Sequence, residues 1–243
     1  MTRLTSELHR LYMPHPATGQ PADEPAPGLI DAQGRVRAMV LELSRPADWG
    51  ALSAVWQGVQ ADLALPAPAI AVSGTDGFQL WFSLAQPVPA AQAWAFMEAL
   101  RARYLPDIRP ERLRLLPQVD GSHPAQHARL IPAPQADEDH WSAFVAPDLA
   151  PVFADTPWLD IPPGRDGQAD VLAPLRSIQP ADFQQALAQL EPAAAQAAVV
   201  TTVAPSAPSL SGSGTDPRRF LLDVMNDETV ALALRIEAAK ALL

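Results

Sequence analysis

Polar and aromatic side chains suited to binding a phosphate-bearing ligand concentrate between residues 42 and 114. A carboxylate such as Glu42 can hold a hard divalent cation. Arginines such as Arg112 and Arg114 can clamp phosphate oxygens, and a tryptophan such as Trp81 can stack on a nucleobase. The full set of candidates is Glu42, Ser44, Ser73, Gln79, Trp81, Arg112 and Arg114. These residues form a site only if the fold brings them to one surface.

Four predicted strands and two predicted helices must position these side chains. The strands are expected at residues 36–44, 69–73, 78–84 and 111–116, and the helices at 49–63 and 89–104. The order strand, helix, strand, strand, helix, strand is typical of an α/β protein with a ferredoxin-like or RRM-like βαββαβ centre. Both helices cover one face of the sheet in that arrangement. The opposite face is therefore expected to be open to ligands or to a partner layer.

Alternation along each strand predicts which side chains share the open face. The side chains expected beneath the helices include Met39, Leu41, Leu43, Leu80 and Phe82. Those expected on the opposite face are Val36, Ala38, Val40, Glu42, Ser44, Ala71, Ser73, Gln79, Trp81, Ser83, Arg112 and Arg114. The polar cluster has two interpretations: it binds a ligand, or Glu42 pairs with Arg112 or Arg114 beneath a covering loop.

Two segments, VLELSRP (40–46) and VSGTDGFQLWFSL (72–84), resemble the archaeo-eukaryotic primase superfamily. That family includes the polymerase domain of bacterial ligase D and the primases of plasmids and phages. Its pattern is Asp-x-Asp on the first strand, followed by Ser-Gly-x-x-Gly-x-His on the hairpin. The hairpin motif is kept here as Ser73, Gly74 and Gly77.

A later segment, RLRLLPQVDGSHP (112–124), is similar to the Arg-Leu-Pro region of the same family. It contains Asp120, which the resemblance suggests as a third acid. The resemblance covers about residues 36–135. It implies the ferredoxin-like sheet, a nucleotide or nucleic-acid ligand and a link to replication in plasmids or phages.

The departures from the family pattern fall on its catalytic positions. Glu42 and Ser44 stand where the family has two aspartates, and Gln79 stands where it has a nucleotide-binding histidine. Two-metal phosphoryl transfer needs several carboxylates around cations about 3.5 to 4 Å apart. Glu42 and the distant Asp120 are a poor set for that task. The resemblance therefore implies a degenerate primase-polymerase-like domain that binds nucleotide, single-stranded nucleic acid or a replication partner without polymerising.

Within that interpretation, the expected ligand-binding residues are Ser73, Gly74, Gly77, Gln79, Trp81, Arg112 and Arg114. Two alternative functions remain open. An active nucleotidyltransferase would use Glu42 and Asp120 as catalytic residues and as ligands of a single Mg²⁺ or Mn²⁺; no other cofactor is expected. A non-enzymatic scaffold would have its sheet face sealed by residues 118–180. An uncovered, arginine-lined cleft favours binding or catalysis, and a sealed face favours the scaffold.

The composition limits the class of protein. With 17 Lys and Arg against 27 Asp and Glu, the net charge of −10 argues against broad adhesion to phosphate backbones, but it does not exclude a small basic site. The absence of cysteine excludes thiol nucleophiles, zinc-thiolate sites and disulfides. No signal peptide and no run of about 18 apolar residues occurs. We therefore expect a cytoplasmic protein without a membrane partner.

Four regions are expected along the chain: an N-terminal arm (1–34), the α/β domain (35–190), a flexible linker (191–215) and a helical tail (216–243). Within the domain, the proline-rich residues 118–180 are expected to form short strands and loops beside the sheet, and a helix is expected at 180–190. The tail resembles segments of phage terminase small subunits. It is expected either to dock a protein partner or to fold back on the domain.

Other residues are expected to be structural. Trp49, Trp56 and Trp94 lie on predicted core faces of the two helices. His123 and His127 have i, i+4 spacing, but the intervening proline favours a solvated loop over a zinc site.

Overall fold

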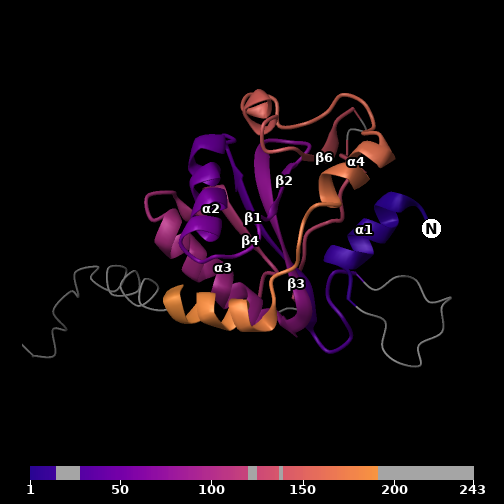
Figure 1. Cartoon of the computed structure of the whole chain (residues 1–243). Coiled ribbons are helices and arrows are strands. Elements are labelled where there is room, and N and C mark those ends of the chain that lie inside the picture. The colour runs from indigo at the N-terminus through magenta and orange to yellow at the C-terminus, as the bar shows by residue number, and fades with distance from the viewer. Residues whose placement is uncertain (15–27, 120–124, 137–138, 191–243) are drawn as a thin grey trace, which may run out of the picture. The chain divides into compact units, whose positions relative to one another are not determined.

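The chain forms a mixed α/β structure in which a curled, six-stranded antiparallel sheet lies between two layers of helices (Figure 1). The computed structural model describes residues 1–14, 28–119, 125–136 and 139–190. All of them belong to one compact unit within Met1–Thr201. Asp120, the expected linker (191–215) and the expected tail (216–243) lie outside the described residues.

The strands follow the order β4-β1-β3-β2-β6-β5 across the sheet. Their bounds are β1 (Arg35–Ser44), β2 (Ala69–Val72), β3 (Gly77–Pro89), β4 (Leu113–Leu116), β5 (Ala133–Pro134) and β6 (Trp141–Val145). The α-helices are α1 (Arg3–Leu11), α2 (Trp49–Ala61), α3 (Ala90–Tyr104) and α4 (Arg165–Leu172), and residues 180–190 are also helical. Two short 3-10 helices, η1 (Pro110–Arg112) and η2 (Ala150–Phe153), complete the described elements.

Local signals in the sequence explain where α2 lies. Its first turn is capped by the Asp48 carboxylate, which accepts a hydrogen bond from the backbone N–H of Ala51 at 2.9 Å. Its apolar face buries Leu52, Val55 and Val59 against the sheet. The helices predicted at 49–63, 89–104 and 180–190 are all present.

The last predicted strand begins later than expected. Residues Pro110–Arg112 form η1, and β4 starts only at Leu113. Proline at the first position favours a helical turn, and the backbone N–H of Arg112 donates to the carbonyl of Arg109 at 3.0 Å. Strand alternation therefore does not apply to Arg112, and its predicted place on the open face was wrong.

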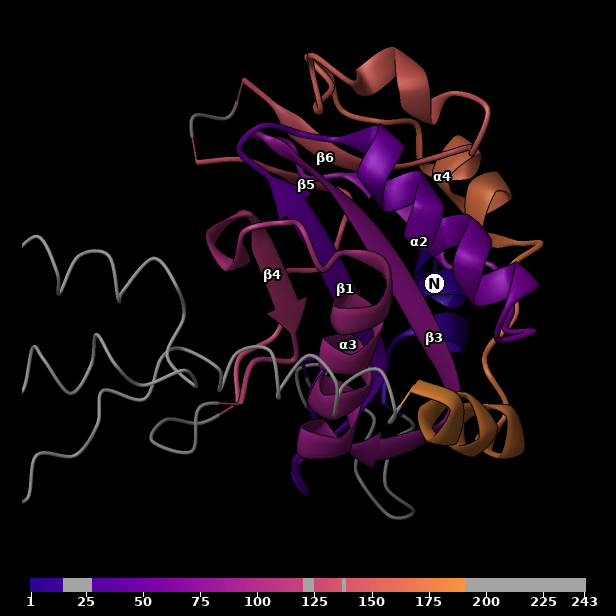
Figure 2. The ribbon, with the colours of Figure 1, turned by 90° about the vertical axis from the view of Figure 1, so that its left-hand side faces the viewer.

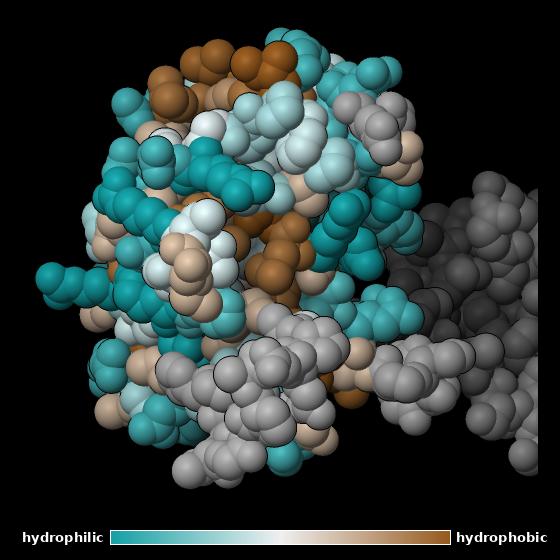
Figure 3. All heavy atoms as spheres, turned by 90° about the vertical axis from the view of Figure 1, so that its right-hand side faces the viewer, coloured by the Kyte–Doolittle hydropathy of each residue, from teal (hydrophilic) through white to brown (hydrophobic). Residues whose placement is uncertain are grey.

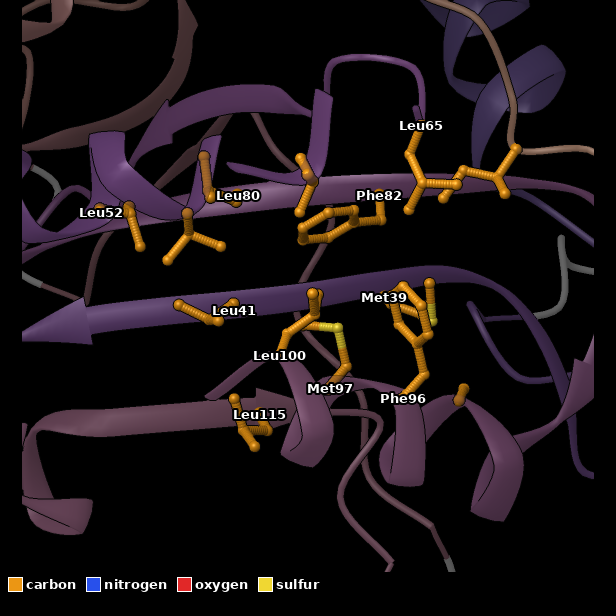
Figure 4. Close-up of a cluster of buried hydrophobic side chains, with 14 of the residues drawn as sticks. Met39, Leu41, Leu52, Leu65, Leu80, Phe82, Phe96, Met97, Leu100 and Leu115 are labelled. Atoms are coloured by element: carbon orange, nitrogen blue, oxygen red, sulfur yellow. The ribbon is translucent and has the colours of Figure 1, made fainter. Parts of the chain in front are cut away.

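A first hydrophobic core lies between the sheet and the layer of α2, α3 and the 180–190 helix (Figures 2 and 4). Met39, Leu41 and Leu43 point into it from β1, as alternation predicted. Full burial of each such side chain stabilises the fold by roughly 1.5–3 kcal/mol. This core fixes the face of the sheet that the two helices cover.

The opposite face of the sheet is also largely covered, so of the two expectations for this face, ligands or a partner layer, the partner layer is present over most of its area. Helices α1 and α4 pack over it and form a second core with Trp81 and Phe144 of the sheet. The Trp81 ring packs edge-on against two other aromatic rings. Its centroid lies 5.3 Å from that of Tyr12 and 5.8 Å from that of Phe144. Figure 3 shows this side of the molecule, where hydrophilic side chains prevail and apolar ones gather at the top.

The start of β1 breaks the simple alternation. The pairing with β3 shifts register between Val36 and Ala38. Val36 therefore lies in the first core, although strict alternation placed it on the opposite face. The bulge also turns the buried Arg37 toward the end of α1, where its guanidinium donates to the carbonyls of Arg10 (2.8 Å) and Met13 (2.9 Å). The same guanidinium donates to the carbonyl of Leu84 in β3 at 2.9 Å. Arg37 thus ties α1 to the sheet.

Candidate functional site

A polar pocket with a volume of about 160 Å³ remains on the covered face, where the curl of the sheet brings β4 and β5 toward each other. Each of the six strands, or a residue next to it, contributes to its wall. The lining residues are Glu42, Ser73, Thr75, Gln79, Arg114, Leu116, Ala128, Arg129, Ile131, Ala133, Gln135 and Ser142. Pockets that bind drug-sized ligands have volumes of roughly 300–1,000 Å³. This pocket therefore admits one phosphate group or a small ring rather than a whole nucleotide.

A chain of hydrogen bonds runs from the second core into the pocket. The indole N–H of Trp81 donates to Gln79 Oε1 at 2.8 Å, and Gln79 Nε2 donates to Glu42 Oε2 at 2.7 Å. An indole N–H can only donate, so it fixes the orientation of the amide. Gln79 must then present its NH₂ group to Glu42. The carboxylate is held in place by one of its two oxygens.

Two arginines line the pocket together with this carboxylate. Arg114 is the cross-strand neighbour of Glu42 in the β1–β4 pairing, and its exposed guanidinium makes no hydrogen bond or ion pair with any described residue. Arg129 donates to the carbonyl of Pro134 at 3.0 Å and has no carboxylate partner within the described ranges. Among the described lining residues, Glu42 is the only carboxylate. The pocket therefore offers more positive than negative charge.

The glycine motif of the hairpin is explained by close packing. Gly74 has a φ of +85°, and a Cβ atom there would lie 2.7 Å from the backbone N of Ser142. A Cβ atom on Gly77 would lie 2.8 Å from the carbonyl oxygen of Leu43. The Ser73 hydroxyl accepts hydrogen bonds from the backbone N–H groups of Thr75 (3.2 Å) and Gly77 (3.0 Å). The motif thus builds a tight turn at the rim of the pocket.

The structure brings together four of the predicted site residues, Glu42, Ser73, Gln79 and Arg114. Trp81 is only 1% exposed, so it positions Gln79 and has no free face for stacking.

Arg112 lies apart from the pocket. Its guanidinium donates to the carbonyls of Ser44 (3.3 Å) and Pro46 (2.9 Å) and lies 3.9 Å from the Asp48 carboxylate. Arg112 therefore holds the end of β1. Ser44 is buried at that strand end and does not line the pocket.

The sequence analysis did not identify several of the pocket residues. Thr75, Arg129, Gln135 and Ser142 line the pocket but were not among the candidates. Alternation within the segment WSAFV would have pointed to Ser142, because Ala143 and Val145 lie in the first core. Arg129 and Gln135 lie in irregular segments, which carry no periodic signal.

One wall of the pocket is anchored by His127. Its Nδ1 accepts the backbone N–H of Ala128 at 2.7 Å, so Nε2 carries the proton and donates to the carbonyl of Ala38 at 2.9 Å. Burial lowers the pKa of His127 to about 4, against the ordinary 6.5. The expectation of a solvated loop was therefore wrong for this histidine. Its contacts hold the segment that carries Ala128 and Arg129.

Within the described ranges, no group of three or more His, Cys, Asp or Glu side chains is placed to hold a metal ion. None of the helices in this part of the chain combines the length and apolar character that crossing a bilayer requires. No family model matches the sequence, and no curated protein is similar to it in sequence.

Proposed function

We propose that this protein is a primase-polymerase-like domain that binds a phosphate-bearing ligand, a nucleotide or single-stranded nucleic acid, without polymerising it. The observation that carries the proposal is the pocket that Arg114 and Arg129 line together with a fixed Glu42. Guanidinium groups bind phosphate oxygens through charge-assisted, bidentate hydrogen bonds. The pocket takes one phosphate group, and the rest of the ligand extends along the exposed side of Arg114.

We also propose that β1-α2-β2-β3-α3-β4 is a ferredoxin-like unit, the arrangement that the resemblance to the primase superfamily implies. The order β4-β1-β3-β2 and the packing of α2 and α3 on one face support this proposal. Helices α1 and α4 then form an added layer over the original ligand face, on which the pocket remains.

The pocket favours binding over catalysis. Glu42 is fixed by Gln79, and Ser44, at the position of the family's second aspartate, does not line the pocket. Two-metal transfer requires several carboxylates around both cations. An active nucleotidyltransferase that holds one Mg²⁺ or Mn²⁺ between Glu42 and Asp120 is the alternative, and the second carboxylate oxygen of Glu42 is the feature that favours it. Primer extension that needs Mg²⁺ or Mn²⁺ and is lost in Glu42→Ala would establish this alternative.

The proposal is tested by titrating the full chain with nucleoside triphosphates and with short single-stranded DNA, followed by fluorescence. We expect Arg114→Ala and Arg129→Ala each to weaken binding about tenfold or more, because a hydrogen bond to a charged group contributes about 1.5–3 kcal/mol. Arg165→Ala is the matched control, since this exposed arginine lies at the start of α4, outside the pocket. Equal affinity in all variants, or no binding by the wild type, would contradict ligand binding in this pocket. The non-enzymatic scaffold would then be the remaining function.

A further inference from the structure

The outer edge of β4 is an unpaired strand edge. Among the described strands, β4 is the last of the sheet, and β1 is its one neighbour there. In an antiparallel pair, every second residue turns its N–H and C=O away from the neighbour. Within the described residues, the Leu113 N–H donates to the carbonyl of Pro110, and no backbone hydrogen bond outside the β1 pairing uses the polar groups of Arg114, Leu115 and Leu116. The opposite end of the sheet is shorter, since β5 has two residues and one is Pro134.

A groove with a volume of about 380 Å³ runs along this edge between β4 and α3, two elements that lie side by side in Figure 2. Leu113 and Leu115 form its floor, and Trp94 of α3 forms part of its wall. Trp94 is 36% exposed, although the helical pattern placed it in the core. Ala93, Phe96, Met97 and Leu100 already fill the core face of α3. An aromatic side chain is thus left partly exposed beside the outer edge of β4.

Three charged side chains of the described residues line the groove, in a chain whose net charge is −10: Glu98, Arg101 and Arg114. Glu98 pairs with Arg101 at 2.8 Å, so the excess charge of the groove is the positive charge of Arg114. Arg114 projects from β4 into the groove as well as into the polar pocket, and no described residue pairs with it. An acidic partner therefore complements this edge.

We propose that the edge of β4 docks an extended segment of another protein, which adds a strand to the sheet. Apolar side chains of that segment lie against Trp94 and Leu113, and an acidic side chain meets Arg114. The affinity comes from main-chain hydrogen bonds, and the specificity comes from the groove and the arginine. This docking does not depend on what the polar pocket binds.

Two other occupants fit the edge less well. Antiparallel pairing of two copies of β4 would bring Arg114 of one copy close to Arg114 of the other, and like charges repel. A nucleic acid could bind the arginines through its phosphates. It has no peptide main chain to pair with the edge of β4, and the groove there is lined by the apolar Leu113 and Leu115. The charge and the main-chain edge together therefore favour an acidic, extended peptide.

The test is a selection of random displayed peptides, about ten residues long, on the full chain. We expect the selected peptides to alternate apolar and acidic residues. Their binding should slow amide exchange at Leu113–Leu116 and should fall about tenfold in Trp94→Ala. Methylation of alternate main-chain nitrogens in the peptide should abolish binding, because it removes the ladder donors. The matched control is Leu149→Ala, which removes an exposed apolar side chain outside the groove.

Three results would overturn the docking proposal. No peptide is enriched in the selection, the selected peptides bind Trp94→Ala as tightly as the wild type, or they still bind after main-chain methylation. Occupation of the groove by single-stranded DNA, seen as loss of its binding in Trp94→Ala, would replace the peptide with a nucleic acid. Self-association that is lost in Trp94→Ala would replace it with a second copy. Nucleotide binding in the pocket of Glu42 is measured separately, so failure of one proposal leaves the other intact.

Discussion

At the scale of single residues, the pocket depends on how Gln79 is oriented. Trp81 fixes the amide from the core side, and the amide in turn fixes Glu42. Gln79 stands where the resembling family has a nucleotide-binding histidine. In this chain it supports the carboxylate rather than facing the ligand alone.

We expect Gln79→Leu to lower the free energy of unfolding by about 1–3 kcal/mol, because the buried Trp81 N–H and the Glu42 carboxylate both lose their partner. Chemical denaturation measures the change. Gln57→Leu, at an exposed position of α2, is the control and should change stability by less than about 0.5 kcal/mol. Equal stability of the two variants would contradict the role given to this hydrogen-bond chain.

At the scale of elements, the attachment of α1 decides whether the second face of the sheet is covered. Arg37 makes the connection, because its guanidinium is bonded to carbonyls at the end of α1 and to Leu84 in β3. Burial lowers the pKa of Arg37, yet the surrounding carbonyls satisfy its donors.

We expect Arg37→Met to cost about 2–4 kcal/mol, since several buried carbonyls would lose their donor. Amide exchange should speed up first in Arg3–Leu11. Arg35→Met is the matched control on the same strand: it removes an exposed pair with Asp31, worth less than about 1 kcal/mol. If α1 keeps its protection in Arg37→Met, apolar packing alone holds the helix.

At the scale of the whole molecule, the domain carries a built-in sensitivity to acid. The folded pKa of His127 is about 4, and the unfolded value is 6.5. Between these pH values the unfolded chain binds more protons than the folded one. The contribution of the neutral His127 side chain to the free energy of unfolding is therefore complete above pH 6.5 and is lost as the pH falls toward 4.

We expect acidification through this window to reduce the free energy of unfolding by up to about 3 kcal/mol. His127→Gln should be less stable at neutral pH and should show a smaller slope between pH 4 and 6.5. Denaturation curves across this range measure both quantities. An unchanged slope would mean that other groups dominate the acid response.

Apart from the helical turn at Pro110–Arg112, the sequence by itself determined the helices and strands between residues 36 and 116 and the neighbourhood of Glu42, Gln79 and Arg114. Strand and helix periods are local properties, and alternation places residues on faces without knowledge of the rest of the fold. The register of β1 with β3 and β4 then makes these three residues neighbours.

Only the tertiary structure decided what covers that face and which residues complete the pocket. Trp81 is buried because α1 and α4 pack over it, and Arg129 joins Arg114 because the sheet curls. The exposure of Trp94 likewise depends on how α3 meets the edge of β4. These outcomes depend on contacts between segments far apart in the chain. No local period encodes such contacts, because they are set by the complementary packing of whole elements.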